Sequence, residues 1–498
     1  MDKINNTEHT LGRIDAEVDD LIGDGLTEVF SNPEEQINNP LIVEHNRILG
    51  ALLLELKPIN FHEKADLAEG VDLTRKHYTI ICIEVILELA KENNFSLCMS
   101  DQQVYVFNGA FYKSLTKEQL GDFLGRAAEK LGVDRFEARH HSFRVELMKQ
   151  FLSTAFLAKP VKNKEEILIN LINGTFVIND DEQKLRDFDR NDFIKYQLPF
   201  AYDSEATAPV FSAYLRRVLP DEKLQMILAE YLGYLFIRPS KLKLEKCLIL
   251  YGSGANGKSV LFEIINALLG AENVCNFSLQ SLTNESGYYR AKLSDKLLNY
   301  ASEISAKMDS TLFKQLVSGE PIEARLPYGD PFVLEDYAKL IFNTNELPKD
   351  VEHNEAFFRR FIILHFGVTI PESERNPQLA SDIIKDELPG VFNWVLSGLC
   401  RIIKQKKFTH SELVENTIDQ YKIQSNSVRL FLEDENYTIN VNSEIPLKQI
   451  YPAYKEYCFD FGYKACGLKS FSERLRHQGF ETTRRNRGMV VNAVKKPF

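Results

Sequence analysis

A glycine-rich segment carries the clearest chemical signal in this sequence. The apolar run 248–251 leads into the pattern G-x-x-x-x-G-K-S, and an apolar, helix-like segment, 260–269, follows it. This order is that of a phosphate-binding loop, whose glycines let backbone N–H groups turn toward phosphate oxygens. The helix after the loop directs the positive end of its dipole at the same anion. The sequence therefore predicts a nucleotide site, and a glycine-rich turn that binds no nucleotide is the alternative.

The loop residues have separate expected roles, and the ligands they predict are ATP and Mg²⁺. Lys258 reaches the β- and γ-phosphates, and Ser259 offers its hydroxyl to Mg²⁺. The predicted nucleotide-binding residues are Gly252, Ser253, Gly254, Ala255, Asn256, Gly257, Lys258 and Ser259.

An acid at the end of the next apolar strand is the candidate general base. Glu303 follows the run 296–301, where a carboxylate can orient and deprotonate the attacking water. Ser302 stands where many ATPases have a metal-binding Asp, which leaves Mg²⁺ to Ser259 and the phosphates. We also expect Glu303 at this metal site. An ordinary surface glutamate is the alternative.

Polar residues also follow a third strand and precede a fourth. Asn345 ends the apolar run 339–344 and can hold the lytic water or the γ-phosphate; an asparagine that only starts a turn is the alternative. Arg359 and Arg360 precede the apolar run 361–364. One of them can act as an arginine finger toward a neighbouring subunit, or both can form surface salt bridges.

The order of the motifs GSGANGKS, NYASE, LIFNTNELP and FFRRF closely resembles the superfamily 3 helicases. The nearest resemblance is to the phage and plasmid primase–helicase C-terminal family, which includes the poxvirus primase–helicase, and it covers residues 78–494. It implies an α/β fold with an AAA+ type P-loop core, a parallel sheet and a helical collar, which acts on DNA as a hexameric ring. Segment 322–334 is similar to the hairpin that points into the channel of such rings, where Arg325 and Tyr328 would contact DNA. Ordinary packing is the alternative for both residues.

The C-terminal segment resembles the winged-helix domain of the same family. It predicts helices at 448–461 and 468–477 and a basic β-wing at 482–494. These elements would present a phosphate-binding face, or only a solvated charged face. The expected DNA contacts are Lys469, Arg474, Arg476, Arg484, Arg485 and Arg487.

Composition places limits on the class of protein. The chain has 498 residues, of which 44% are hydrophobic, and a net charge of −11. Acids dominate the first forty residues and bases the last thirty, and this asymmetry indicates a nucleic-acid surface at one end. The seven cysteines are scattered singly, which argues against zinc or iron–sulfur sites. No secretory signal or membrane span is visible, so we expect a cytoplasmic protein of a bacterium or virus-infected cell that has no membrane partner.

We expect five regions along the chain. They are an acidic region of unknown role at 1–76, an accessory α/β module at 77–203, the ATPase domain with its helical collar at 204–400, a helical connector at 401–440 and the winged helix at 441–498. The accessory module should contain hairpins around 108–109 and 173–174, where Asn-Gly pairs occur. Residues 1–76 are too few for a primase fold, so a separate primase or replication initiator is an expected partner.

These patterns and the resemblance together predict an ATP-dependent DNA helicase or translocase that acts as a ring in the replication of a phage, plasmid or mobile element. The main alternative is an ATPase initiator or loader that binds DNA without unwinding it. A small-molecule P-loop kinase would need neither a basic winged helix nor the paired arginines. The intact Lys258, Ser259 and Glu303 argue against a non-enzymatic scaffold.

Overall fold

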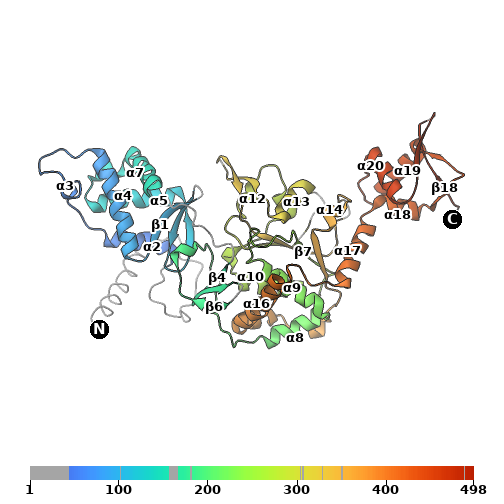
Figure 1. The fold of residues 1–498 in the computed structure, drawn as a ribbon, viewed down its shortest axis with the longest axis horizontal. Coiled ribbons are helices and arrows are strands. Elements are labelled where there is room, and N and C mark those ends of the chain that lie inside the picture. The colour runs from blue at the N-terminus through green and yellow to red at the C-terminus, as the bar shows by residue number, and fades with distance from the viewer. Residues whose placement is uncertain are drawn as a thin grey trace. The chain divides into compact units, whose positions relative to one another are not determined.

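The computed structural model describes residues 44–100, 103–155, 166–179, 182–302, 304, 308–327, 329–348, 351–486 and 488–497. Three expected site residues, Glu303, Tyr328 and Arg487, lie outside this described part, as do residues 1–43. The chain divides into two compact units, Met1–Tyr202 and Asp203–Phe498 (Figure 1). The expectation of a mixed α/β fold with a parallel sheet is confirmed.

The described part of the first unit combines a helical core with two antiparallel sheets. Its helices are α2 (His45–Glu55), α3 (Phe61–Lys64), α4 (Arg75–Glu92), α5 (Lys117–Leu131), α6 (Arg135–Arg139) and α7 (His141–Thr154). The strands β1 (Ser96–Ser100), β2 (Gln103–Phe107) and β3 (Tyr112–Leu115) form one sheet, and β4 (Ile167–Leu171), β5 (Gly174–Ile178) and β6 (Gln183–Arg186) form the other. Buried apolar side chains of α4, α5 and α7 share one core with those of β1 and β2.

Both expected hairpins of this unit are present. Between β2 and β3, the Asn108 side chain accepts hydrogen bonds from the N–H groups of Ala110 and Phe111, both at 3.0 Å, and Gly109 has φ +97°. Between β4 and β5, Gly174 has φ +146°. Each Asn-Gly pair thus supplies a glycine at positive φ where the chain reverses, and Asn108 adds a side-chain acceptor within its own turn.

A five-stranded parallel sheet organises the second unit, with the order β13-β7-β12-β9-β8. Its strands are β7 (Cys247–Tyr251), β8 (Val274–Cys275), β9 (Leu298–Ala301), β12 (Lys339–Thr344) and β13 (Phe361–His365). A separate hairpin consists of β10 (Ile322–Arg325) and β11 (Pro331–Leu334). Four of the five residues of β7 are buried, because neighbouring strands pair with it on both sides.

Helices surround this sheet; in the view of Figure 1, α9, α10 and α16 lie below β7, and α12 and α13 above it. They are α8 (Pro209–Val218), α9 (Glu222–Tyr234), α10 (Lys258–Leu269), α11 (Leu279–Leu282), α12 (Tyr288–Ala291), α13 (Ser310–Ser318), α14 (Glu355–Phe358), α15 (Leu379–Asp386), α16 (Leu388–Gln405) and α17 (Glu412–Gln424). α9 and α16 approach so closely that a Cβ on Gly398 would lie 2.3 Å from the Ala229 carbonyl carbon. The Glu230 carboxylate is fully buried there and accepts hydrogen bonds from Arg401 Nε at 2.7 Å and Thr409 N at 2.8 Å. This satisfied network ties the helices that precede the sheet to those that follow it.

The C-terminal part has its own core. It contains α18 (Ser427–Asp434), β14 (Tyr437–Ile439), β15 (Ile445–Pro446), α19 (Leu447–Asp460), α20 (Leu468–His477), β16 (Thr482–Arg485), β17 (Gly488–Val491) and β18 (Ala493–Lys495). Both expected helices are present, as α19 and α20. The segment expected to form the wing contains β16 and β17, which pair with each other, and β18, which pairs with β14. Its hydrophobic cluster begins at Val428, earlier than the boundary expected at 441, because α18 contributes Phe431 and Leu432 to it. α16 likewise continues past the boundary expected at 400, where Ile402 is buried.

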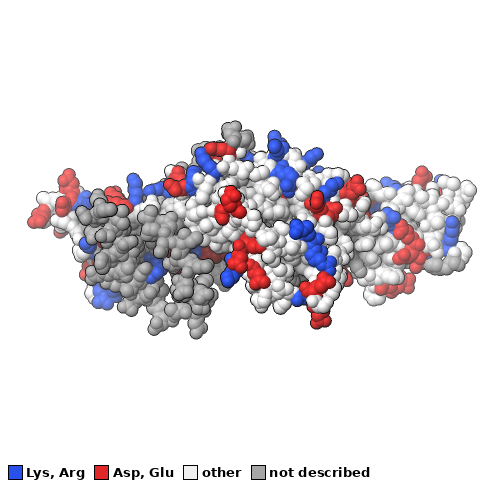
Figure 2. Space-filling model, turned by 90° about the horizontal axis from the view of Figure 1, so that it is seen from below, with Lys and Arg blue, Asp and Glu red and all other residues white. Residues whose placement is uncertain are grey.

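Charge is mixed over the described surface. On the face that Figure 2 shows, basic and acidic side chains alternate over short distances. No helix of the described residues is long and apolar enough to span a membrane.

Candidate functional site

The loop between β7 and α10 is shaped by two glycines that no larger residue can replace without displacement. Gly257 has φ +86°, and a Cβ there would lie 2.6 Å from Val218 Cγ1. A Cβ on Gly252 would lie 2.4 Å from the Phe366 carbonyl oxygen. By contrast, a Cβ on Gly254 would have nothing within 4 Å. The loop is therefore closely packed at both ends and open in its middle, which is the shape of a cradle.

Hydrogen bonds fix the loop from the elements around it. The Asn256 amide donates to the carbonyls of Ser253 and Phe366, the latter at 3.2 Å. The Tyr214 hydroxyl of α8 donates to the Gly257 carbonyl at 2.8 Å. Ala255, at φ +60°, accepts from Ile370 N at 2.8 Å. These contacts hold a strained backbone in place before any ligand arrives, which reduces the ordering that binding requires.

The Lys258 amine faces into this cradle. The residue is 7% exposed, and Nζ donates to the Gly252 carbonyl at 2.5 Å, to Asn256 Oδ1 at 3.0 Å and to Asn345 Oδ1 at 3.4 Å. Burial lowers the pKa of this amine. Two residues that the sequence analysis selected separately, Lys258 and Asn345, thus meet at the carboxyl edge of neighbouring strands β7 and β12, where parallel sheets bind ligands.

The start of α10 adds donors to the same place. Gly257 is its N-cap and supplies no side-chain hydrogen bond, so the first N–H groups of the helix keep their capacity for an acceptor. Ser253 and Ala255 are exposed on the loop, and Ser259 is exposed on the first helical turn. The backbone N–H groups and the buried amine are hydrogen-bond donors that fit phosphate oxygens. The hydroxyl oxygen of Ser259 is a ligand that fits a phosphate-bound Mg²⁺.

The expected metal and base positions are only partly described. Ser302 is exposed after β9, and its neighbour Glu303 lies outside the described residues. Within the described part, no group of three His, Cys, Asp or Glu residues could hold a metal ion. The expected roles of Glu303 in catalysis and metal binding therefore remain predictions.

The two expected finger arginines lie at the opposite edge of the sheet. They precede β13, which runs parallel to β7, whereas the glycine-rich loop follows β7. The structure therefore does not bring them to Lys258 within one chain. The Arg359 side chain is 59% exposed, but that of Arg360 is only 10% exposed and donates from Nη2 to Ser318 Oγ at 3.0 Å. Of the two, only Arg359 has a largely exposed side chain.

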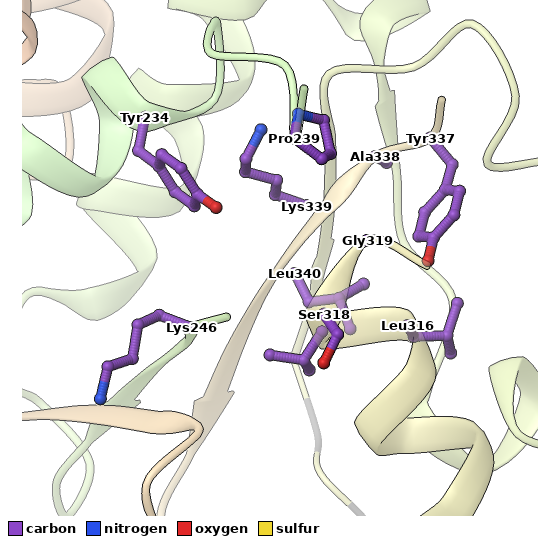
Figure 3. Close-up of a pocket in the computed structure, with 11 residues that line it drawn as sticks. Tyr234, Pro239, Lys246, Leu316, Ser318, Gly319, Tyr337, Ala338, Lys339 and Leu340 are labelled. Atoms are coloured by element: carbon purple, nitrogen blue, oxygen red, sulfur yellow. The ribbon is translucent and has the colours of Figure 1, made fainter. Parts of the chain in front are cut away.

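Sequence reasoning missed a small pocket at this amino edge of the sheet (Figure 3). It has a volume of about 30 Å³, and Lys246, Lys339 and Ser318 line it. Lys339 Nζ donates to the Ile237 carbonyl at 2.6 Å and lies 4.5 Å from the centre of the Tyr234 ring, and burial lowers its pKa to about 7. The only signal in the sequence is a lysine at the start of an otherwise apolar strand.

The β10–β11 hairpin is anchored at its base. Arg290 is 4% exposed and donates from Nε to the Glu323 carbonyl at 2.9 Å and from Nη1 to the Leu282 carbonyl at 3.1 Å. Arg325 is exposed at the end of β10, where its Nε donates to the Gly329 carbonyl at 2.8 Å. Tyr328, within the turn, lies outside the described residues. Arg325 thus lies at the hairpin tip, and part of its donor capacity binds the turn.

The basic residues of the C-terminal part differ in their availability. Lys469 and Arg476 are exposed on α20 and Arg474 is half-buried, whereas Arg484 is exposed on β16. Arg485 forms an ion pair with Glu444 at 2.5 Å. Among the described residues, Lys469, Arg474 and Arg484 form no ion pair. Arg487 lies outside that part of the chain.

Comparisons with known proteins cover both units. The family model "D5 N terminal like" matches residues 81–220, and the "Family of unknown function (DUF5906)" matches residues 250–360, from the end of β7 to Arg360. A protein of Acanthamoeba polyphaga mimivirus, "Putative helicase L207/L206", is 22% identical over 394 residues, which are 72% of this chain and 40% of the relative. The chain thus spans less than half the length of this curated relative.

Solved structures of the NrS-1 C-terminal region also resemble the chain, at TM-scores of 0.46 and 0.47 and identities of 12% and 13%. Each covers 84% of this chain and 99% of the solved one. This resemblance is too distant to carry a functional argument.

Proposed function

We propose that this chain is an ATP-driven DNA helicase of the superfamily 3 type, with an AAA+ P-loop core and a C-terminal winged helix, that works as a hexameric ring. The observation that carries the proposal is the buried Lys258 amine, held in a glycine cradle beside Asn345 at the carboxyl edge of a parallel sheet. The similarity to a viral protein named as a helicase also supports this proposal.

In this proposal each residue performs one task. Lys258 and the first N–H groups of α10 bind the phosphates of ATP, and Ser259 holds Mg²⁺, which neutralises phosphate charge when bound. Glu303 takes a proton from the attacking water, and Asn345 orients that water against the γ-phosphate. Arg359 of a neighbouring subunit stabilises the charge that develops in the transition state.

The work on DNA falls to two surfaces. The β10–β11 hairpin, with Arg325 and Tyr328, would contact the strand in the ring channel, and the basic C-terminal part would dock onto the DNA backbone. Priming, if the system requires it, would come from a separate primase. An initiator or loader that never unwinds DNA remains the second candidate, because the same nucleotide site serves both activities.

The decisive experiment measures ATP hydrolysis and strand displacement on a forked DNA. Lys258→Ala should abolish nucleotide binding, whereas Glu303→Gln should keep binding and lower the rate of hydrolysis by about 10²–10⁴-fold. Lys223→Ala, at an exposed position on α9, is the matched control and should behave as the wild type. Hydrolysis without strand displacement would favour the loader, and full hydrolysis by Lys258→Ala would reject the nucleotide site.

A further inference from the structure

An arginine that acts on a neighbouring subunit must be held in one direction before the neighbour arrives. Arg359 has a long side chain that is 59% exposed, and such a side chain samples many rotamers unless something restrains it. The surroundings of Arg359 therefore show what could restrain it. This inference rests on the role proposed above for Arg359.

Glu245 makes the side-chain contact. Its Oε2 lies 3.4 Å from Arg359 Nη2 and 3.7 Å from Arg360 Nη2, and its Oε1 lies 3.6 Å from Lys243 Nζ. Glu245 has φ +54°, a left-handed conformation that is uncommon for a residue with a side chain. A strained backbone that places a carboxylate between three cations indicates that the direction of this side chain matters.

The two residues after Glu245 hold the backbone of both arginines, Lys246 through its side chain and Cys247 through its main chain. Lys246 Nζ donates to the Arg359 carbonyl at 2.5 Å, and Cys247 N donates to the Arg360 carbonyl at 2.7 Å. Arg360 is buried and bound to Ser318, which lies with Lys246 at the pocket of Figure 3. Residues 245–247 thus fix the base of Arg359 from one side, and Glu245 reaches its guanidinium.

We propose that Glu245 is the positioning residue of Arg359 and so serves the ATP site of the adjacent subunit. Its place in the sequence, directly before the phosphate-loop strand, favours a role in its own site, but the structure puts its carboxylate at the opposite edge of the sheet. A guanidinium has five N–H donors. The contact with Glu245 uses Nη2 of Arg359, and the other N–H groups of this guanidinium are left to bind a phosphate. An ion pair this exposed adds little to stability, so its loss should change orientation more than folding.

The first test compares Glu245→Gln with Glu320→Gln. Glu320 forms an exposed pair with the same Lys243, at 3.5 Å, but contacts neither arginine. Glu245→Gln should lower kcat for ATP about 10- to 100-fold with little change in KM, because misplacing a catalytic group by about 1 Å costs up to about 10² in rate. Glu320→Gln should keep the wild-type rate, and Glu245→Asp should recover part of it. An unchanged kcat in Glu245→Gln would overturn the inference.

The second test mixes variant subunits, which separates a trans role from a fold defect. Glu245→Gln mixed with Lys258→Ala should regain activity, since some interfaces then combine an intact phosphate loop with an intact finger. Glu245→Gln mixed with Arg359→Ala should not, because both lack the finger. The reverse pattern, or no recovery with either partner, would overturn the role of Glu245.

A reference mixture keeps the two proposals distinct. Arg359→Ala mixed with Lys258→Ala tests the finger itself, independently of Glu245. If that mixture stays inactive, the trans site has failed and the assignment of Glu245 falls with it. If it recovers while Glu245→Gln behaves as the wild type, only the assignment of Glu245 is wrong.

Discussion

The Lys258 amine is surrounded by neutral oxygens of Gly252, Asn256 and Asn345. Burial lowers its pKa because these carbonyl and amide partners replace water only in part. A phosphate would offer charged oxygens in their place, and charge-assisted hydrogen bonds are roughly twice as strong as neutral ones. Replacing these neutral oxygens by phosphate oxygens would therefore strengthen the hydrogen bonds of Lys258, and this favours the binding of an anion.

Other properties of single residues could not be predicted from the sequence. The pattern FFRRF treats Arg359 and Arg360 alike, whereas the fold buries one and exposes the other. Glu245 and Lys339 belong to no motif, and the contacts of Glu245 with Arg359 and of Lys339 with Ile237 join segments about a hundred residues apart. A motif reports local geometry, but burial and long-range contacts depend on the whole fold.

The glycines of the loop give a prediction at this scale. Gly257→Ala should destabilise the second unit by about 1–3 kcal/mol, because alanine would have to adopt φ +86°. Its Cβ would also press on Val218 Cγ1. Affinity for ATP should fall as the loop shifts. Gly254→Ala is the control, since its Cβ would meet nothing. Urea unfolding and nucleotide anisotropy measure the two effects, and equal behaviour of both variants would contradict the proposed cradle.

Among the elements, those with strong local signals were predicted well. α20 has the expected bounds, and β10–β11 spans the expected hairpin segment, 322–334. The order β13-β7-β12-β9-β8 could not be deduced from these segments one by one, because parallel strands pair across long crossovers and β7 pairs with β12 and β13, which are far from it in the sequence. The contribution of α18 to the C-terminal core was missed for a similar reason. Its apolar face does not reveal which core it joins.

Strand β16, which lies in the segment expected to form a wing, carries a prediction at the scale of elements. Arg484 is exposed without an ion pair, whereas Arg485 is bound to Glu444. If β16 faces DNA, Arg484→Ala should reduce the slope of log K against log salt by up to about 0.9 on duplex DNA, or about 0.7 on single strands. Arg485→Ala should reduce it less, because Glu444 already neutralises that charge. Fluorescence anisotropy over a salt series measures both slopes, and unchanged values for both variants would assign these arginines to a solvated face.

At the scale of the molecule, the described residues of the candidate nucleotide site and the core beneath them belong to one unit. Lys258, Asn345 and Arg359 all lie within Asp203–Phe498, and the hydrophobic cluster around the sheet draws only on residues of that unit. The first unit has a separate core that runs from Ile48 to Ala155. Hydrolysis of ATP should therefore not require residues 1–202, whatever those residues contribute on DNA.

A truncated chain that begins at Asp203 tests this separation. It should keep kcat and KM for ATP close to those of the full chain, because α8 and α9 remain to support the loop and the sheet. A shorter chain that begins at Lys243 is the matched control. It loses Tyr214, which holds the Gly257 carbonyl, and it loses Glu230, whose buried carboxylate binds Arg401 and Thr409. Removing one side of a buried charged network typically costs about 3–5 kcal/mol, so the control should unfold or lose ATPase activity. Circular dichroism melting and steady-state hydrolysis, measured on all three chains, decide the outcome. If the chain from Asp203 melts like a folded protein but no longer hydrolyses ATP, the first unit takes part in the nucleotide site or in the assembly that completes it.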